Sequence, residues 1–468
     1  MEKLKLKEKI GYGFGDFASS MFWKMFGVYL LFFYTDVFGI SAAVVGTMFL
    51  VTRIFDGIND PVMGIIADKT NTKWGKFRPY LLWMAIPFGI FGILTFTTPD
   101  FSTSGKIIYA YTMYCLMMIV YTAINVPYAS LMGVMTSNLK DRTSLASFRF
   151  VFAFAGSILV LATAEPLVDY FSTISGSEGT QQAWQYTMIV YALIAIGFFI
   201  GTFYLTKERV QPPKDQKTAI KTDLKNLAKN KPWFVLLAAG VCSLIFNSIR
   251  DGSAIYYFKY YFTNQDAFQL PVVEIAITFS TLYLVLGQAA NILGVIMAKP
   301  ISDKIGKKKT FIAAMLLASL LSCVFFFLGE SDMTLIFVFQ FLISICAGII
   351  FPLLWSMYAD IADFSEWKTG RRATGLIFSS SSMSQKMGWT LGGALTGWML
   401  AFYGFEANVV QTEAARTGIR LMMSFLPAAG ALFSAIFLIF YNLDDRLMLT
   451  INLDLASRKN NNNSNSIQ

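Results

Sequence analysis

Apolar stretches long enough to cross a bilayer recur along the chain, with short polar segments between them. A helical crossing needs roughly 20 mostly apolar residues. About twelve stretches reach this length, and their ends are placed to within about three residues. We therefore predict an all-α integral membrane protein. The expected crossings are 10–35, 42–67, 79–97, 107–133, 145–170, 184–205, 233–262, 273–299, 310–329, 334–358, 374–403 and 414–441.

The longest polar segment inside the chain divides these crossings into two sets of six. It contains Pro212-Pro213 and a Lys-rich run. A weak internal repeat agrees with this division, because the second and eighth crossings both end in Asp-Lys, at Asp68-Lys69 and Asp303-Lys304, before further basic residues. We expect an N-terminal half over 1–209, a cytoplasmic linker over 210–232, a C-terminal half over 233–442, and a disordered, Asn-rich cytoplasmic tail over 443–468.

Basic residues gather on alternate loops, and the loops between these hold almost none. Positive charge stays on the cytoplasmic side of a membrane, so both termini are expected there. The net charge of +9, 38 basic residues minus 29 acidic ones, follows largely from this distribution. Basic residues on separate loops make no continuous stripe for nucleic acid, and no such partner is expected.

Composition excludes several other classes of protein. Hydrophobic residues make up 55% of the chain, and aromatic residues (16%) outnumber charged ones (14%), which a soluble domain would not tolerate. The chain has no histidine, so His-based metal sites and proton relays are excluded. Its four cysteines lie in apolar stretches at no metal-ligand spacing. With no nucleophile motif in a polar setting, we expect no enzyme.

Two carboxylates lie inside the second crossing. Asp56 and Asp60 are four residues apart, so both lie on one helix face, with Asn59 beside them and Arg53 one turn before Asp56. Intramembrane acids are costly and usually mark ion or proton pathways. The hypothesis is that this face binds a cation. The alternative is an internal ion-pair network with Arg53 or with an arginine of another helix.

Several ordered motifs carry a family resemblance. The paired Asp-Lys loops resemble the major facilitator superfamily over residues 9–442. More narrowly, the chain resembles the melibiose permease-like glycoside-pentoside-hexuronide cation symporter family. The motifs are Gly13-Phe14-Gly15-Asp16, Tyr34-Thr35-Asp36, Arg53 to Pro61, Trp74 to Pro79, Asn125-Val126-Pro127-Tyr128, Tyr256-Tyr257-Phe258 and Glu366 to Gly370.

The resemblance implies a major facilitator fold with two pseudo-symmetric six-helix halves, and it implies a cation site. The implied cation ligands are Asp56, Asn59, Asp60, Thr122 and Asn125. In melibiose permease-like members the residue at the position of Asn125 is a carboxylate, whereas here it is an amide. One anionic ligand fewer weakens the attraction for Na⁺ and leaves the choice between Na⁺ and H⁺ open.

The resemblance also implies a sugar site. Family positions that contact the sugar fall on Asp16 and Arg149, and cavity positions fall on Trp355 and Lys386. Asn125 and Tyr128 share a helix face and are expected to bind hydroxyl groups. Arg250 lies mid-crossing and is a further candidate, unless it pairs with other charges. For Trp355 a packing or lipid-facing role is the alternative.

A third set of residues is expected to act in gating by forming ion pairs across the two halves. These residues lie at cytoplasmic helix ends, where topology alone explains the basic members but not the acidic ones. They are Asp68, Lys69, Arg78, Asp303, Asp363, Glu366 and Arg371.

The implied function is secondary active import of a sugar, glycoside or uronide by alternating access. A Na⁺ or H⁺ gradient would drive it, with no other cofactor, in the cell inner membrane and as a monomer. The alternative is a lipid or lysolipid carrier of the same superfamily. Such a carrier would need a more apolar cavity, and Asp16, Arg149 and Asn125 argue against it.

Overall fold

The computed structural model describes residues 4–136, 139–175, 179–209, 227, 229–262, 268–269, 276–369 and 374–465. Most of the predicted linker and Arg371 lie outside these residues.

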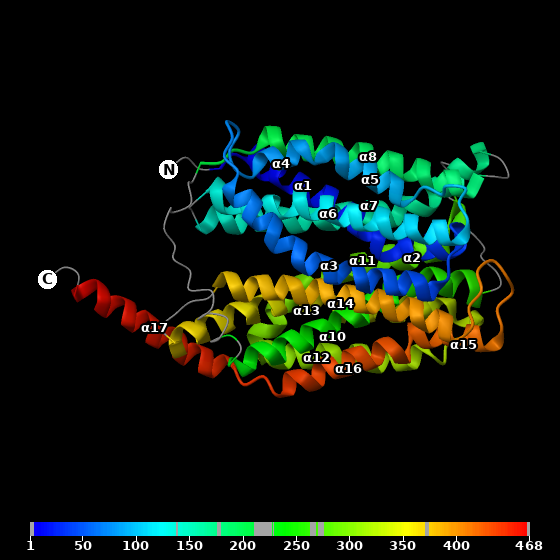
Figure 1. Ribbon diagram of the computed structural model, residues 1–468. Coiled ribbons are helices and arrows are strands. Elements are labelled where there is room, and N and C mark those ends of the chain that lie inside the picture. The colour runs from blue at the N-terminus through cyan, green and yellow to red at the C-terminus, as the bar shows by residue number, and fades with distance from the viewer. Residues whose placement is uncertain are drawn as a thin grey trace. The chain divides into compact units, whose positions relative to one another are not determined.

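Helices occupy all six crossings predicted in the first half of the chain (Figure 1). The first crossing is a continuous helix that alternates between α and π geometry. The elements are α1 (Leu6–Lys24), η1 (Met25–Tyr29), α2 (Leu30–Phe32), η2 (Phe33–Val37), α3 (Ala42–Lys69), α4 (Arg78–Trp83), α5 (Ala85–Thr95), α6 (Thr103–Met135), α7 (Leu139–Ser175) and α8 (Gly179–Leu205).

The second half of the chain follows the same plan. Its elements are α10 (Lys231–Tyr256), η4 (Tyr257–Tyr261), α11 (Phe279–Ile305), α12 (Lys307–Phe325), η5 (Glu330–Asp332), α13 (Met333–Thr369), α14 (Thr374–Phe402), α15 (Glu413–Met423), α16 (Phe425–Ile439) and α17 (Asp445–Asn465). Two short antiparallel strands, β1 (Phe268–Gln269) and β2 (Ala276–Ile277), precede α11. In the described part of the chain, nine helices are long and apolar enough to cross a membrane, and two shorter apolar helices lie in α3 and α5. The all-α membrane fold is confirmed.

Two crossings are broken where a proline follows. The break at Met84 separates α4 from α5, and the break at Ser424 separates α15 from α16. Pro87 and Pro427 lie three residues after these breaks. A proline ring clashes with the carbonyl four residues earlier and removes one helical hydrogen bond, which explains both positions.

Some predicted helix ends are wrong by more than three residues. The eighth crossing begins at Phe279, not at 273, because residues 276–277 belong to β2. The tenth runs to Thr369, well past the predicted end at 358, and its last turns carry Asp360, Asp363 and Glu366. Hydropathy marks the part of a helix that lies in hydrocarbon, and a helix continues beyond it.

The prediction of a disordered tail needs correction for most of its residues, which form α17. Met448, Ile451 and Leu455 are buried and lie on one helix face. The indole nitrogen of Trp367 on α13 donates a hydrogen bond of 2.7 Å to Asp454. Packing against α13 therefore orders a segment whose composition alone favours disorder.

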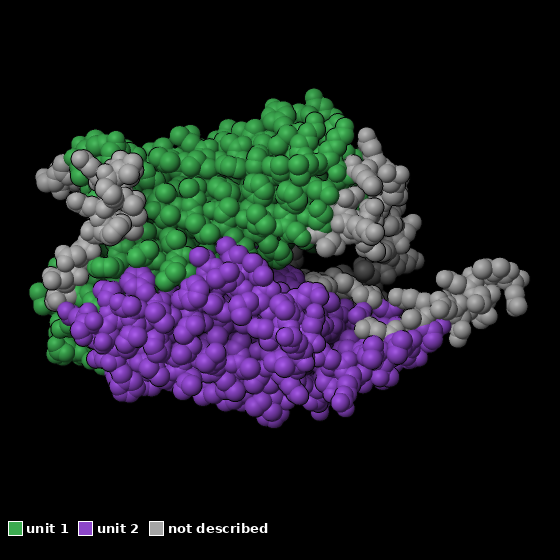
Figure 2. Space-filling model, turned by 180° about the vertical axis from the view of Figure 1, so that it is seen from behind, with its two compact units in different colours: residues 1–214, 251–288, 393–419 green, residues 215–250, 289–392, 420–468 purple. Residues whose placement is uncertain are grey.

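The chain forms two compact units (Figure 2). Unit 1 comprises residues 1–214, 251–288 and 393–419, and unit 2 comprises 215–250, 289–392 and 420–468. Their boundaries differ from those of the two predicted six-helix halves, which stay a prediction. In unit 1, α1 packs along α7 and α8. Gly156 permits this approach, since a Cβ there would overlap the carbonyl oxygen of Phe17. In unit 2, α12 packs against α13 and α16.

Candidate cation and sugar site

A hydrogen bond joins the two helices that carry the predicted cation ligands. The hydroxyl of Thr122 on α6 donates to Asp60 on α3 over 2.9 Å. These helices pack against each other in unit 1, and the four-residue spacing keeps Asp56 on the face of Asp60. Asp56 is buried, with 3% of its surface exposed. The two residues therefore lie close together, as the family resemblance implied, and their binding of a cation stays a prediction.

Asn59 adds a neutral group beside these carboxylates. Its amide nitrogen is buried and has no hydrogen-bond partner among the described residues. An amide nitrogen donates hydrogen bonds and does not bind a cation, so Asn59 would act as a ligand through its carbonyl oxygen, after rotation of the amide by about 180°. The described residues contain no group of three or more His, Cys, Asp or Glu side chains suited to a metal ion. Carboxylates and neutral oxygens are donor types that hard cations prefer, and cation binding at this face stays a prediction.

Asn125 connects α6 to α1. Its side-chain oxygen accepts a 2.7 Å hydrogen bond from Ser19, and its nitrogen donates to the carbonyl of Tyr121 over 3.0 Å. Both the oxygen and the nitrogen of the Asn125 amide thus form hydrogen bonds within the protein. Ser19, which is 3% exposed, was not predicted from the sequence. The signal that could have found it is its position three residues after Asp16, on the same face of α1.

Asp16 and Arg149 form a two-point ion pair between α1 and α7. The Nε of Arg149 donates to one carboxylate oxygen, and Nη2 donates to the other over 3.2 Å. Both side chains keep some exposure, 14% for Asp16 and 28% for Arg149. A guanidinium has five N–H groups and a carboxylate about four acceptor positions, so this pair has capacity for a ligand as well.

Tyr128 packs against the guanidinium of this ion pair. Its ring stacks on that of Tyr12 with centroids 4.8 Å apart, and its hydroxyl donates to the Tyr12 carbonyl over 2.6 Å. The guanidinium carbon of Arg149 lies 5.2 Å from the centroid of the Tyr128 ring, within cation–π range. Tyr128 is fully buried here, so its observed contacts position Arg149. Its predicted contact with a sugar hydroxyl stays a prediction.

The sugar-site candidates of unit 2 differ in their surroundings. Arg250 is 5% exposed and donates to Gln340 over 2.7 Å and to the carbonyl of Met423 over 2.9 Å. Both of these partners are neutral groups of unit 2, and the predicted sugar contact of Arg250 and its alternative, pairing with other charges, both stay predictions. Trp355 on α13 and Lys386 on α14 are only partly buried, and their sugar contacts stay predictions.

Arg78 is held by neighbouring elements of the first half. Its guanidinium donates to the carbonyls of Phe203 and Trp74 over 2.7 and 3.3 Å. The carboxylate of Glu208 accepts from the backbone N–H groups of Lys76, Phe77 and Arg78 over 2.8–3.0 Å. Burial lowers the pKa of Arg78, and the Glu208 carboxylate opposes this shift. Glu208 was not predicted, although it is an acid among basic residues after the sixth crossing.

The other gating candidates are described only in part. Lys69 is exposed, and Asp303 forms an exposed i, i+4 pair with Lys299 over 3.0 Å, a kind of pair that contributes little to stability. Asp363 and Glu366 lie on the last turns of α13. The side chain of Asp68 and all of Arg371 lie outside the described residues, so cross-half pairing stays a prediction.

Comparison with known proteins shows similarity over nearly the whole chain. The family described as "MFS/sugar transport protein" matches residues 11–445. The "Inner membrane symporter YicJ" of Escherichia coli is 37% identical, covering 98% of this chain and 96% of that protein. The "Isoprimeverose transporter" of Lactiplantibacillus pentosus is 37% identical, covering 93% and 88%. The "Glucuronide carrier protein homolog" of E. coli is 30% identical, covering 98% and 97%.

Solved structures agree at the level of fold. A bacterial homolog of the human lysosomal transporter Spinster gives a TM-score of 0.68 at 13% identity, over 95% of this chain and 97% of that one. A D-xylose-proton symporter gives a TM-score of 0.64 at 14% identity, over 94% and 97%. At such identities the likeness concerns the fold alone.

Proposed function

Since the chain belongs to the MFS/sugar transport protein family and, within it, to the glycoside-pentoside-hexuronide cation symporters, we propose which of its residues bind the sugar and which bind the cation. The protein is a multi-pass membrane transporter that moves a sugar together with a cation, and it is not an enzyme. Asp16 and Arg149 bind the sugar. Asp56, Asn59, Asp60 and Thr122 bind the cation.

The observation that carries this proposal is the arrangement of polar side chains in unit 1. The Asp16–Arg149 pair and the Asp60–Thr122 pair lie on helices of one compact unit. The Ser19–Asn125 bond joins α1, which carries Asp16, to α6, which carries Thr122. Two carboxylates on one helix face repel each other, and a bound cation removes that repulsion. A sugar that leaves water needs a new partner for each hydroxyl, and charged partners make the stronger hydrogen bonds.

For the substrate we propose a neutral glycoside, with a pentose-containing disaccharide as the first choice. The charge of Arg149 is already balanced by Asp16, so this pair is neutral overall and suits hydroxyl groups better than a carboxylate. A uronide would bring its own negative charge close to Asp16. The relative named as an isoprimeverose transporter supports this choice over the relative named as a glucuronide carrier homolog.

For the coupling ion we propose Na⁺. The predicted ligands are all oxygen donors, which a small hard cation prefers, and Asn59 and Thr122 supply neutral oxygens next to the carboxylates. Protonation of a single carboxylate would not require these neutral ligands. The basic loops support a location in the cytoplasmic membrane with both termini inside.

Uptake into membrane vesicles tests the proposal. Radiolabelled neutral glycosides, uronides and a phospholipid are offered under an inward Na⁺ gradient, an inward proton gradient, or neither. Na⁺-driven accumulation of a neutral glycoside is expected. Accumulation of uronides alone, accumulation driven by protons alone, or phospholipid movement would each overturn the corresponding part of the proposal.

A further inference from the structure

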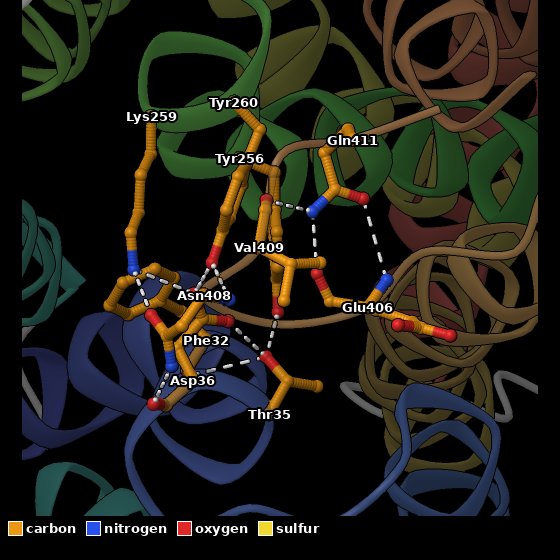
Figure 3. Close-up of polar contacts among 10 residues, drawn as sticks. All are labelled: Phe32, Thr35, Asp36, Tyr256, Lys259, Tyr260, Glu406, Asn408, Val409 and Gln411. Atoms are coloured by element: carbon orange, nitrogen blue, oxygen red, sulfur yellow. Dashed lines mark hydrogen bonds and ion pairs between the residues drawn. The ribbon is translucent and has the colours of Figure 1, made fainter. Parts of the chain in front are cut away.

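Three distant segments of unit 1 meet around the carboxylate of Asp36 (Figure 3). They are the end of the first crossing, the end of the seventh crossing, and the loop that follows α14. We call the residues Thr35, Asp36, Tyr256, Lys259, Tyr260 and Asn408 the Asp36 cluster. None of them is among the residues proposed above to bind sugar or cation.

Asp36 is the acceptor at the centre of this cluster. Lys259 donates to its carboxylate over 2.8 Å, Thr35 donates over 2.7 Å, and the hydroxyl of Tyr260 donates as well. The Asp36 side chain is only 1% exposed. The hydroxyl of Tyr256 lies 2.7 Å from that of Thr35 and extends the network. A carboxylate this buried depends on its donors, because a buried charge without partners is strongly unfavourable.

Asn408 brings the loop after α14 into the cluster. Its amide nitrogen donates to the backbone carbonyl of Asp36 over 2.7 Å, and its side-chain oxygen accepts from Lys259 over 2.9 Å. Its backbone N–H donates to the Tyr260 hydroxyl over 3.0 Å. Asn408 has φ of 60°, a left-handed conformation that asparagine tolerates better than most residues. Gln411 braces the same loop by donating to the carbonyls of Val409 and Glu406.

Both helices that enter the cluster change to π geometry there. The π segment η2 contains Thr35 and Asp36, and the π segment η4 contains Lys259 and Tyr260. Short π segments are rare and often occur at functional sites, because the wider turn changes the direction in which side chains point. Here the two wide turns belong to crossings one and seven, and their side chains bond to each other.

We propose that the Asp36 cluster closes the end of the transporter opposite the basic loops, and that its bonds must break each time that end opens. The inference rests on the proposed function, because only alternating access requires the crossing-one segment to separate from crossings seven and eleven. One further ion pair joins the same two crossings, between Lys24 and Asp251 over 2.7 Å. Weakening the bonds between Asp36 and its donors should therefore favour the open state.

A cysteine placed one helical turn before the cluster on α10 reports, by its rate of labelling from outside, whether this end is closed. Gly252 is buried and lies one turn before Tyr256 on the same face of α10. A Cβ at Gly252 would lie 3.8 Å from the nearest atom, the carbonyl oxygen of Gly27, so the Cβ of Gly252→Cys is placed without overlap. The native residues Cys115, Cys242, Cys323 and Cys346 are replaced by alanine. Right-side-out vesicles that carry the full chain are then treated with a membrane-impermeant maleimide.

Slow labelling is expected when the cluster is intact, and about tenfold faster labelling in Asp36→Asn. Tyr260→Phe removes one donor and keeps the ring, so it should give a smaller increase in the same direction. The control is Asp100→Asn, which changes an exposed carboxylate in the loop before α6 and should leave the rate unchanged. The exchanged pair Asp36→Lys with Lys259→Asp should slow labelling again relative to Asp36→Asn.

Unchanged labelling in both Asp36→Asn and Tyr260→Phe would overturn the proposed closure. If Asp36→Asn does not reach the membrane, the rate in Tyr260→Phe decides alone. Because labelling needs neither sugar nor cation, its outcome is separate from transport. A protein that labels as expected but accumulates no sugar would overturn the proposed function and keep the closure.

Discussion

Ser19 on α1 donates a 2.7 Å hydrogen bond to the side-chain oxygen of Asn125 on α6. Ser19 lies one turn from Asp16, and Asn125 lies one turn from Thr122. Asp16 bonds to Arg149, and Thr122 bonds to Asp60. The Ser19–Asn125 bond therefore offers a short physical connection between the residues proposed to bind sugar and those proposed to bind the cation.

Ser19→Ala tests this connection. The substitution removes a neutral hydrogen bond, about 0.5–1.5 kcal/mol, and leaves the charged residues in place. We expect each ligand to bind alone with nearly normal affinity, while the increase in sugar affinity caused by cation falls severalfold. Titration calorimetry of sugar, with and without Na⁺, measures this coupling.

Ser130→Ala is the matched control for Ser19→Ala. Ser130 is exposed, and its hydroxyl bonds only to the carbonyl of Val126 on its own helix among the contacts described. Its removal should leave coupling unchanged. Equal coupling in Ser19→Ala and in the parent protein would show that the two sites communicate by another route.

The carboxylates of α3 should control coupling and not sugar recognition. We expect Asp56→Asn and Asp60→Asn each to abolish accumulation against a gradient while some downhill exchange remains, since only the link to the cation is lost. Uptake and counterflow in the same vesicles measure the two quantities. Full accumulation in both single variants would rule out a cation site at this face.

Much of the fold was predictable because a membrane imposes a strong local signal. Any crossing helix must present about 20 apolar residues, and all twelve predicted crossings contain helix. The pairing of Asp60 with Thr122 was predictable in part, because helical spacing and family resemblance point to the same face. The sequence also explains the helix break at Met84, because Pro87 lies three residues after it.

The remaining contacts depend on tertiary packing that periodicity does not report. In the sequence, Ser19 is an ordinary small residue. Its role depends on Asn125, which lies next to it only when α6 packs against α1. Glu208 gains its role only when the end of the loop before α4 and the first residue of α4 present three backbone N–H groups to it. The helical tail, α17, was missed because a run of asparagines dominates its composition, while Ile451 and Trp367 decide its packing.

Asn125→Asp tests how close this residue lies to the cation. The Asn125 nitrogen donates to the carbonyl of Tyr121, and a carboxylate cannot replace that donor. The new side chain should turn away from the carbonyl, toward a cation shared with Asp60, and raise the dependence of uptake on Na⁺. If the new charge instead repels Asp56 and Asp60, one of them should bind a proton.

Sugar uptake against Na⁺ concentration, at fixed membrane potential and at two pH values, separates these outcomes for Asn125→Asp. A lower half-saturating Na⁺ concentration means a shared cation, and new proton dependence means repulsion. If neither changes, Asn125 lies outside the cation shell, and its bond to Ser19 is its main role.

The ion pair between Arg149 and Asp16 leads to the last prediction. Arg149 uses two N–H groups in a planar arrangement to hold both carboxylate oxygens, and Tyr128 supports the guanidinium from one side. Arg149→Lys keeps the charge but loses the planar arrangement, so it should weaken sugar binding by about tenfold or more. Asp16→Asn should weaken it similarly, because the partly buried guanidinium loses its counter-charge. Cation binding without sugar should survive in both variants, unlike in Asp56→Asn, and calorimetry of the purified variants with each ligand makes the distinction. Normal sugar affinity in Arg149→Lys would instead show that the pair only holds α1 against α7, and the sugar-binding residues would then have to be sought elsewhere in the chain.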